Sequence, residues 1–297
     1  KTWPTSYGGR GGSYDYEGSR PAAAPKKGFI WDHCRKAGVT YRSYGEFQAY
    51  AKRKGSALEG HFAPGYRDFD MNYKDVDRIT VWKKEIDSLI AANAVPQLST
   101  VRLGNDHTSG ARVGALTPAA CVADNDLALG QFVEHLSKSK IWNESAIFVL
   151  EDDAQNGPDH VDAHRSPAFV ISPYTRRKHV EHTMYSTSSM LRTIELILGL
   201  PPMSQYDAAA TPMFACFTST PDPTPYTAIQ AGVDLDAKNT AWTEPARISE
   251  QFDLRYADKI DDKLFNEVIW KAVKGEHSVM PAPRRGAFVN LPAKDAD

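Results

Sequence analysis

Residues 145–164 read SAIFVLEDDAQNGPDHVDAH, where a short apolar run leads directly into a dense group of ionisable side chains. The apolar part, residues 145–150, predicts a strand that is covered on both faces. The group that follows holds five carboxylates and two imidazoles: Glu151, Asp152, Asp153, Asp159, Asp162, His160 and His164. Charges this dense repel one another unless they face water or share a counter-ion. The stretch therefore predicts either a solvated acidic loop or a cation site at the end of a buried strand.

The rest of the chain alternates between helical and strand patterns. Helical spacing of apolar side chains occurs in residues 28–38, 75–93, 124–142 and 186–200. Strand patterns occupy residues 39–45, 98–103, 145–150 and 167–172. Such alternation, with strands that are apolar on both faces, is typical of a parallel sheet covered by helices. We therefore predict an α/β fold with a mainly parallel sheet flanked by helices.

The domain organisation follows from the same patterns. Residues 1–297 form a single predicted domain, which opens with an irregular lead rich in Gly and Tyr over residues 1–27. The α/β core is predicted over residues 28–200, with an irregular excursion at 46–74. Residues 201–297 are predicted to be extended and Pro-rich, with a last helix at 258–275 and an exposed tail from residue 281.

The composition excludes some classes of partner. The 297 residues include 35 Lys and Arg against 37 Asp and Glu, a net charge of −2. This balance lacks the basic surface of a nucleic-acid-binding protein, so we expect no nucleic-acid partner. No apolar run approaches the roughly 18 residues of a membrane helix, so we expect no integral membrane segment. Three scattered cysteines indicate neither a disulfide framework nor a zinc knot.

Two predicted strands end in ionisable clusters. The strand at 145–150 leads into Asp152 and Asp153, and the strand at 98–103 leads into Asp106 and His107. In an open α/β sheet, ligands bind beyond the carboxyl ends of the strands, because loops from several strands converge there. We therefore expect these side chains to share one pocket.

Neighbouring motifs admit other interpretations. An EF-hand loop that starts at Asp152 is excluded, because its third and twelfth positions are Ala154 and Ala163. The Gly-Gly-Arg-Gly-Gly run at residues 8–12 predicts a plain loop. Alternatively, its backbone approaches a phosphate, and the guanidinium of Arg10 binds the substrate.

Several motifs together resemble one enzyme family. The stretch EDDAQNGPDHVDAHRSPAFVISPYT (151–175) lies between RLGNDHTSG (102–110) and MYSTSSMLRTIELILGLPPMSQYDAAATPM (184–213). In this order they are similar to the phosphoesterase family, which includes phospholipase C and acid phosphatase relatives within the alkaline phosphatase superfamily. The similarity is strong over residues 105–217 and looser toward the N-terminus.

The resemblance implies an alkaline phosphatase-like phosphohydrolase that uses a divalent metal ion and a Ser or Thr nucleophile. In that family the acidic pair binds the metal, and the upstream histidine contacts the phosphoryl oxygens or assists the leaving group. Carried over to this chain, the motifs imply metal ligation by Asp152, Asp153, Asp106 and His164, and catalytic roles for His107 and His160.

The family's first metal ligands and its nucleophile precede the segment where this chain begins. The resemblance therefore implies a fold that is incomplete at its N-terminus and carries about half of the metal site. The missing N-terminal part would belong to a longer bacterial precursor, since the chain starts at Lys1 without a Met.

A small phosphoester or phospholipid substrate and a periplasmic or secreted location are implied in the same way. The identity of the metal is left open among Zn, Ca, Mg, Mn and Fe, because carboxylates and imidazoles prefer different ions. The alternative is a non-catalytic domain whose acidic loop binds a cation or a partner.

Overall fold

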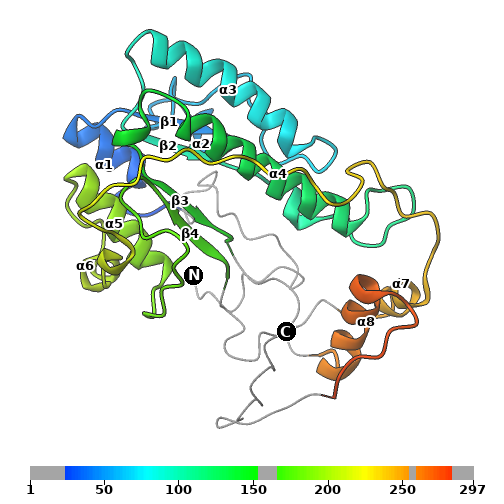
Figure 1. Ribbon diagram of the computed structural model, residues 1–297. Helices are drawn as coiled ribbons and strands as arrows, with labels where there is room; N and C mark the ends of the chain where they lie inside the picture. Colours follow the sequence, from blue (N-terminus) through cyan, green and yellow to red (C-terminus); the bar gives the residue numbers. More distant parts are fainter. Residues whose placement is uncertain (1–23, 153–165, 254–258, 283–297) are drawn as a thin grey trace.

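A computed structural model describes residues 24–152, 166–253 and 259–282, and they form a mixed α/β fold (Figure 1). The first half contains α1 (Ile30–Ala37), β1 (Tyr41–Tyr44), the short α2 (Gln48–Ala51), α3 (Asp75–Ala91) and β2 (Leu98–Val101). β1 and β2 pair in parallel, with Tyr41 opposite Leu98 and Tyr44 opposite Val101. The predicted order of helix, strand, excursion, helix and strand is therefore confirmed.

The second pair of strands runs in opposite directions. β3 (Ile147–Leu150) and β4 (Ala168–Ile171) are antiparallel, with Ile147 opposite Ile171 and Leu150 opposite Ala168. The strands were predicted correctly, but the described strands form one parallel and one antiparallel pair, and not a mainly parallel sheet. An apolar run carries no information on strand direction, because direction depends on which residues pair across the sheet.

The predicted burial of the strands on both faces is also wrong for the second pair. The side chain of Phe169 is 55% exposed, and that of Leu150 is 39% exposed. Within the described residues, helices cover only part of this pair, so an apolar run here does not correspond to full burial.

Helices α3 and α4 (Pro118–Ser137) pack side by side over the parallel pair (Figure 1). Trp82 of α3 stacks on Phe132 of α4 with ring centroids 4.2 Å apart. The main core cluster joins this helix pair to β1 and β3, and its buried members include Tyr44, Tyr66, Ile79, Trp82, Ile86, Ala128, Val133, Leu136, Trp142 and Ile147. The helix pair and these strands therefore share one hydrophobic core.

The remaining elements follow the α/β core. They are α5 (Thr187–Leu198), α6 (Gln205–Ala209), α7 (Glu244–Ser249) and α8 (Asp262–Lys274), with short 3-10 turns η3 (Asn105–His107), η4 (Trp142–Glu144) and η5 (Phe214–Cys216). The helix predicted near residues 258–275 is confirmed as α8, whereas α2, α6 and α7 lie in stretches that were predicted to be irregular or extended. Figure 1 shows α7 and α8 packed together at a distance from the strands. Within the described residues, no helix combines the length and the apolar character needed to cross a membrane.

Candidate functional site

The structure places three of the predicted site residues just beyond the ends of β2 and β3, which belong to different two-stranded sheets. Asp106 and His107 lie on η3, which follows β2 after a short link, and Asp152 lies two residues beyond the end of β3. The charge of Asp152 makes a minor contribution to raising the pKa of Asp106. The other predicted site residues, Asp153, His160, His164 and Arg10, lie outside the described residues.

The carboxyl group of Asp106 is half-buried among other charges. Its pKa is raised above the ordinary value chiefly by burial, while the adjacent His107 lowers it. The negative charges of Asp75 and Asp152 raise the pKa further. A carboxylate in this setting gains from any cation that approaches it, since a positive charge offsets both the burial and the repulsion.

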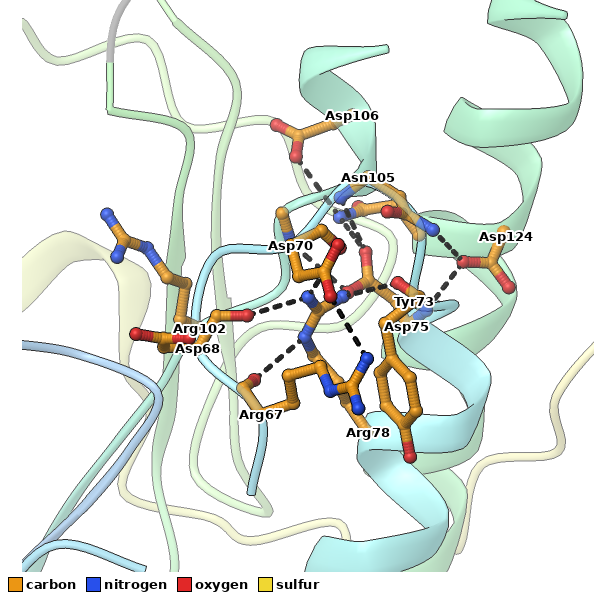
Figure 2. Close-up of polar contacts among 12 residues, drawn as sticks. Arg67, Asp68, Asp70, Tyr73, Asp75, Arg78, Arg102, Asn105, Asp106 and Asp124 are labelled. Atoms are coloured by element: carbon orange, nitrogen blue, oxygen red, sulfur yellow. Dashed lines mark hydrogen bonds and ion pairs between the residues drawn. The ribbon is translucent and has the colours of Figure 1, made fainter. Parts of the chain in front are cut away.

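The turn that carries Asp106 and His107 is held by a carboxylate from another element. Asp75, the first residue of α3, is fully buried. Its Oδ1 accepts the Gly104 backbone N–H at 3.1 Å, and its Oδ2 accepts the Asn105 backbone N–H at 2.8 Å. The start of α3 therefore fixes the backbone of η3 directly, as Figure 2 shows.

Helix α4 holds the same turn through two neighbouring side chains. Asn125 Nδ2 lies 3.0 Å from Oδ2 of Asp75 and 3.3 Å from Oδ1 of Asp106, so it connects the two carboxylates. Asp124 Oδ2 accepts the Asn105 side-chain amide at 2.6 Å and the Asp75 backbone N–H at 2.6 Å. Burial raises the pKa of Asp124, whereas these two donors lower it. Asp106 is thus oriented by an amide that is itself anchored in the core.

Arg78 connects this cluster to the excursion at 46–74. Its guanidinium is 1% exposed and donates to Oδ1 of Asp75 at 2.8 Å (Figure 2). The remaining donors of Arg78 bind the backbone carbonyls of Arg67, Asp68, Asp70 and Tyr73. A planar guanidinium with several donors suits such a role, since it can satisfy several carbonyls at once.

The excursion therefore lies against the candidate site. Phe69 packs edge-on against the His107 ring, with ring centroids 5.0 Å apart. The Arg102 guanidinium lies 5.6 Å from the centre of the same phenyl ring. Phe69 is nevertheless 45% exposed, so it presents an aromatic surface beside His107.

Sequence patterns did not identify these supporting residues. Asp75 stands at the start of an amphipathic helix, where an acidic residue is ordinarily an exposed partner of the helix dipole. Arg78 and Asp124 interrupt the apolar stripes of their helices, and no sequence motif indicates that they support a site. Phe69 lies in an excursion without periodicity, so only the folded chain reveals that it contacts His107.

The donors that a metal ion would need are present only in part among the described residues. No group of three His, Cys, Asp or Glu side chains comes close enough there to hold an ion. The carboxylates of Asp106 and Asp152 are oxygen donors of the type that hard divalent cations prefer. The other predicted ligands, Asp153 and His164, lie outside the part of the chain that is described.

The fold and the site define a mixed α/β protein with carboxylates and a histidine gathered beyond the ends of its strands. Residues 5–201, more than half of the chain, match the Phosphoesterase family, and the chain therefore belongs to that family. This confirms the resemblance drawn from the motifs and indicates hydrolysis of phosphoester bonds as the class of reaction. No curated protein matches the chain.

Proposed function

We propose that this chain takes part in the metal-dependent hydrolysis of phosphoric esters, with Asp106, His107 and Asp152 in its active site. The observation that carries the proposal is that Asp106 and His107 follow β2 and Asp152 follows β3 in a chain that belongs to the Phosphoesterase family. The charge of Asp152 also adds to the factors that raise the pKa of the half-buried Asp106, and a cation near both carboxylates would oppose that effect.

Each residue has a role that suits its surroundings. Asp152 and Asp153 hold a divalent ion, with Asp106 and His164 as further ligands. When bound, the ion neutralises charge on the phosphoryl group. His107, held in place by η3 and by Phe69, donates a hydrogen bond to a phosphoryl oxygen or a proton to the leaving group. His160 acts beside it, and Arg10 binds the phosphate of the substrate.

The proposal extends to the whole protein. The nucleophile and the remaining ligands are supplied by an N-terminal part of a longer bacterial protein, which is periplasmic or secreted. Its substrate is a small phosphoester or a phospholipid, in the manner of phospholipase C or acid phosphatase. Zn, Ca, Mg, Mn or Fe are the candidate ions, and the oxygen donors of Asp106 and Asp152 favour Mg, Ca or Mn.

Binding of Mn²⁺ to the isolated chain tests the metal site without requiring turnover. We expect substoichiometric Mn²⁺ to broaden the amide NMR signals of residues 106, 107 and 152 before others. Asp152→Asn should weaken the binding by about tenfold or more. Glu144→Gln is the matched control, because this exposed carboxylate lies at the opposite end of β3, and it should leave the affinity unchanged. Equal affinities of the two variants would contradict the assignment.

Hydrolysis of a chromogenic phosphate ester by the full-length protein tests the catalytic claim. Phosphate release should require the metal and should be lost in Asp152→Asn, whose urea midpoint should remain close to that of the unmodified protein. A full-length protein that binds Mn²⁺ through Asp152 but hydrolyses neither monoesters nor diesters would support the alternative, a non-catalytic domain that binds a cation or a partner.

A further inference from the structure

A basic cavity lies beside the N-terminal end of α1, and it shares no residue with the candidate active site. Its volume is about 350 Å³, and it is lined by residues 24–29, Asp32 and Lys36 of α1, and residues 50 and 53–56. This size is at the lower end of the range for small-molecule sites. The lining comes from three segments, the lead into α1, α1 itself and the chain that follows α2.

Cations dominate the lining. Lys26, Lys27, Lys36, Arg53 and Lys54 all border the cavity, and none of them forms an ion pair with another described residue. Some other cations of the chain are paired, for example Arg42 with Glu85 at 2.7 Å. Five cations without an ion-pair partner among the described residues are thus concentrated here, in a chain whose net charge is −2. This concentration of charge indicates a preference for an anionic ligand, because clustered cations repel one another until an anion screens them.

The acidic groups near the cavity are committed to the backbone and to neighbours. Asp32 Oδ2 accepts the Phe29 N–H at 2.9 Å and the Tyr50 hydroxyl at 2.9 Å, and its Oδ1 lies 3.3 Å from Arg35. Glu59 accepts the Gly55 N–H at 2.6 Å. These contacts fix both carboxylates, so neither forms an ion pair with the lysines around the cavity.

A buried hydroxyl on the lining also lacks a partner. Ser56 borders the cavity and is 8% exposed, and its Oγ makes no hydrogen bond within the described chain. Buried polar groups in folded proteins are almost always paired, and an unpaired one lowers stability. The oxygen itself has almost no solvent-accessible surface, so the hydroxyl does not face the cavity, and a bound anion would be held by the cations.

We propose that the basic cavity binds a small phosphate-bearing anion, either free in solution or as the headgroup of a phospholipid. Ammonium groups act as point charges that bind phosphate oxygens from several directions, and the Arg53 guanidinium adds a planar fork. The tetrahedral phosphate has enough acceptor oxygens for several of these donors. The site does not depend on the proposed hydrolysis, because none of its residues serves that reaction.

Titration of the ¹⁵N-labelled chain with inorganic phosphate tests the site. We expect amide shifts in residues 26–36 and 53–56, which distinguish this cavity from the turn at 104–107. The double variant Arg53→Gln with Lys54→Gln should weaken phosphate binding by about tenfold or more. The matched control, Lys84→Gln with Lys140→Gln, removes the same charge from exposed positions elsewhere and should change the affinity by less than about twofold.

Vesicles separate the two sources of the anion. The second probe is sedimentation with phosphatidylcholine vesicles that contain about 20% phosphatidic acid. The ligand is a lipid headgroup if the chain sediments with these vesicles while free phosphate causes no amide shifts. In that case the Arg53 and Lys54 variant should fail to sediment, whereas the control variant should still do so. The proposal is overturned if the chain binds neither probe, or if the variant and its control behave alike with both. Such a failure leaves Mn²⁺ binding at Asp152 untouched, so it is distinct from failure of the proposed function.

Discussion

At the scale of single residues, the pair formed by Asp75 and Arg78 decides how the candidate site is built. Both side chains are almost completely buried, and together they join the excursion, the start of α3 and η3. Removal of one member of a buried ion pair leaves the other charged and without its partner, which costs more than the pair itself contributes.

We therefore expect Asp75→Ala to lower the free energy of unfolding by about 3–5 kcal/mol, as measured by urea denaturation. Asp77→Ala is the control, because Asp77 is exposed in the same helical turn, and it should cost about 1 kcal/mol or less. Comparable losses in the two variants would show that Asp75 acts only through the helix dipole.

The site residues differ in how far they could be predicted. Asp106, His107 and Asp152 were predicted because each lies just after an apolar strand, a position where ligands commonly bind. Asp75 and Phe69 could not be predicted in the same way. Their roles arise from contacts with residues that are 29 or more positions away, such as Asp75 with Gly104, and no local pattern encodes such a contact.

At the scale of elements, α4 shows where a periodic pattern misjudges a helix boundary. The apolar stripe predicted a helix over residues 124–142, but α4 begins at Pro118 and ends at Ser137. Its true start has a capping residue followed by a proline, because Thr117 Oγ1 accepts the Ala120 N–H at 3.1 Å. The early start places Asp124 and Asn125 inside a stable helix, where they can hold η3.

Thr117→Ala should lower the free energy of unfolding by about 1 kcal/mol, because the Ala120 N–H loses its acceptor. Thr117→Ser keeps the oxygen and should restore most of the stability. Thr80→Ala serves as a control in the exposed middle of α3, where alanine is the better helix former and should be neutral or slightly stabilising. Chemical denaturation of the three variants measures their free energies of unfolding. A Thr117→Ser variant as unstable as Thr117→Ala would show that loss of the cap is not the cause of the lower stability.

At the scale of the whole molecule, the chain after α6 is folded back over the core. Asn239 Nδ2 donates to the carbonyls of Gly110 at 2.9 Å and Arg112 at 3.1 Å, and Lys74 pairs with Asp236 at 2.6 Å. The Pro-rich segment therefore helps to close the loop between η3 and α4. Figure 1 shows this segment running alongside α4 before it reaches α7.

The core also makes the protein sensitive to alkali. Burial raises the pKa of Cys34 to about 11 and raises the pKa of Tyr44 and Tyr66 above their ordinary value. The unfolded chain loses these protons at lower pH than the folded chain. The stabilisation is therefore complete below about pH 9 and is lost as the pH rises toward 11.

We expect the free energy of unfolding to fall between pH 8 and pH 10.5, with Cys34 contributing at most about 2–3 kcal/mol to the total decline toward pH 11. Cys34→Ala should be less stable at pH 8 but should lose less on going to alkaline pH. Urea midpoints at several pH values measure both slopes, and parallel curves for the two proteins would contradict a role for this thiol.

The sequence by itself determined the strands, the longer helices, their order and the family, because helical spacing, apolar runs and motifs are local properties of the chain. Only the tertiary structure decided the antiparallel pairing of β3 and β4, the exposure of Phe169 and the anchoring of η3 by Asp75. These features depend on which distant residues meet, and the free energy of such contacts is defined only once the whole chain has packed.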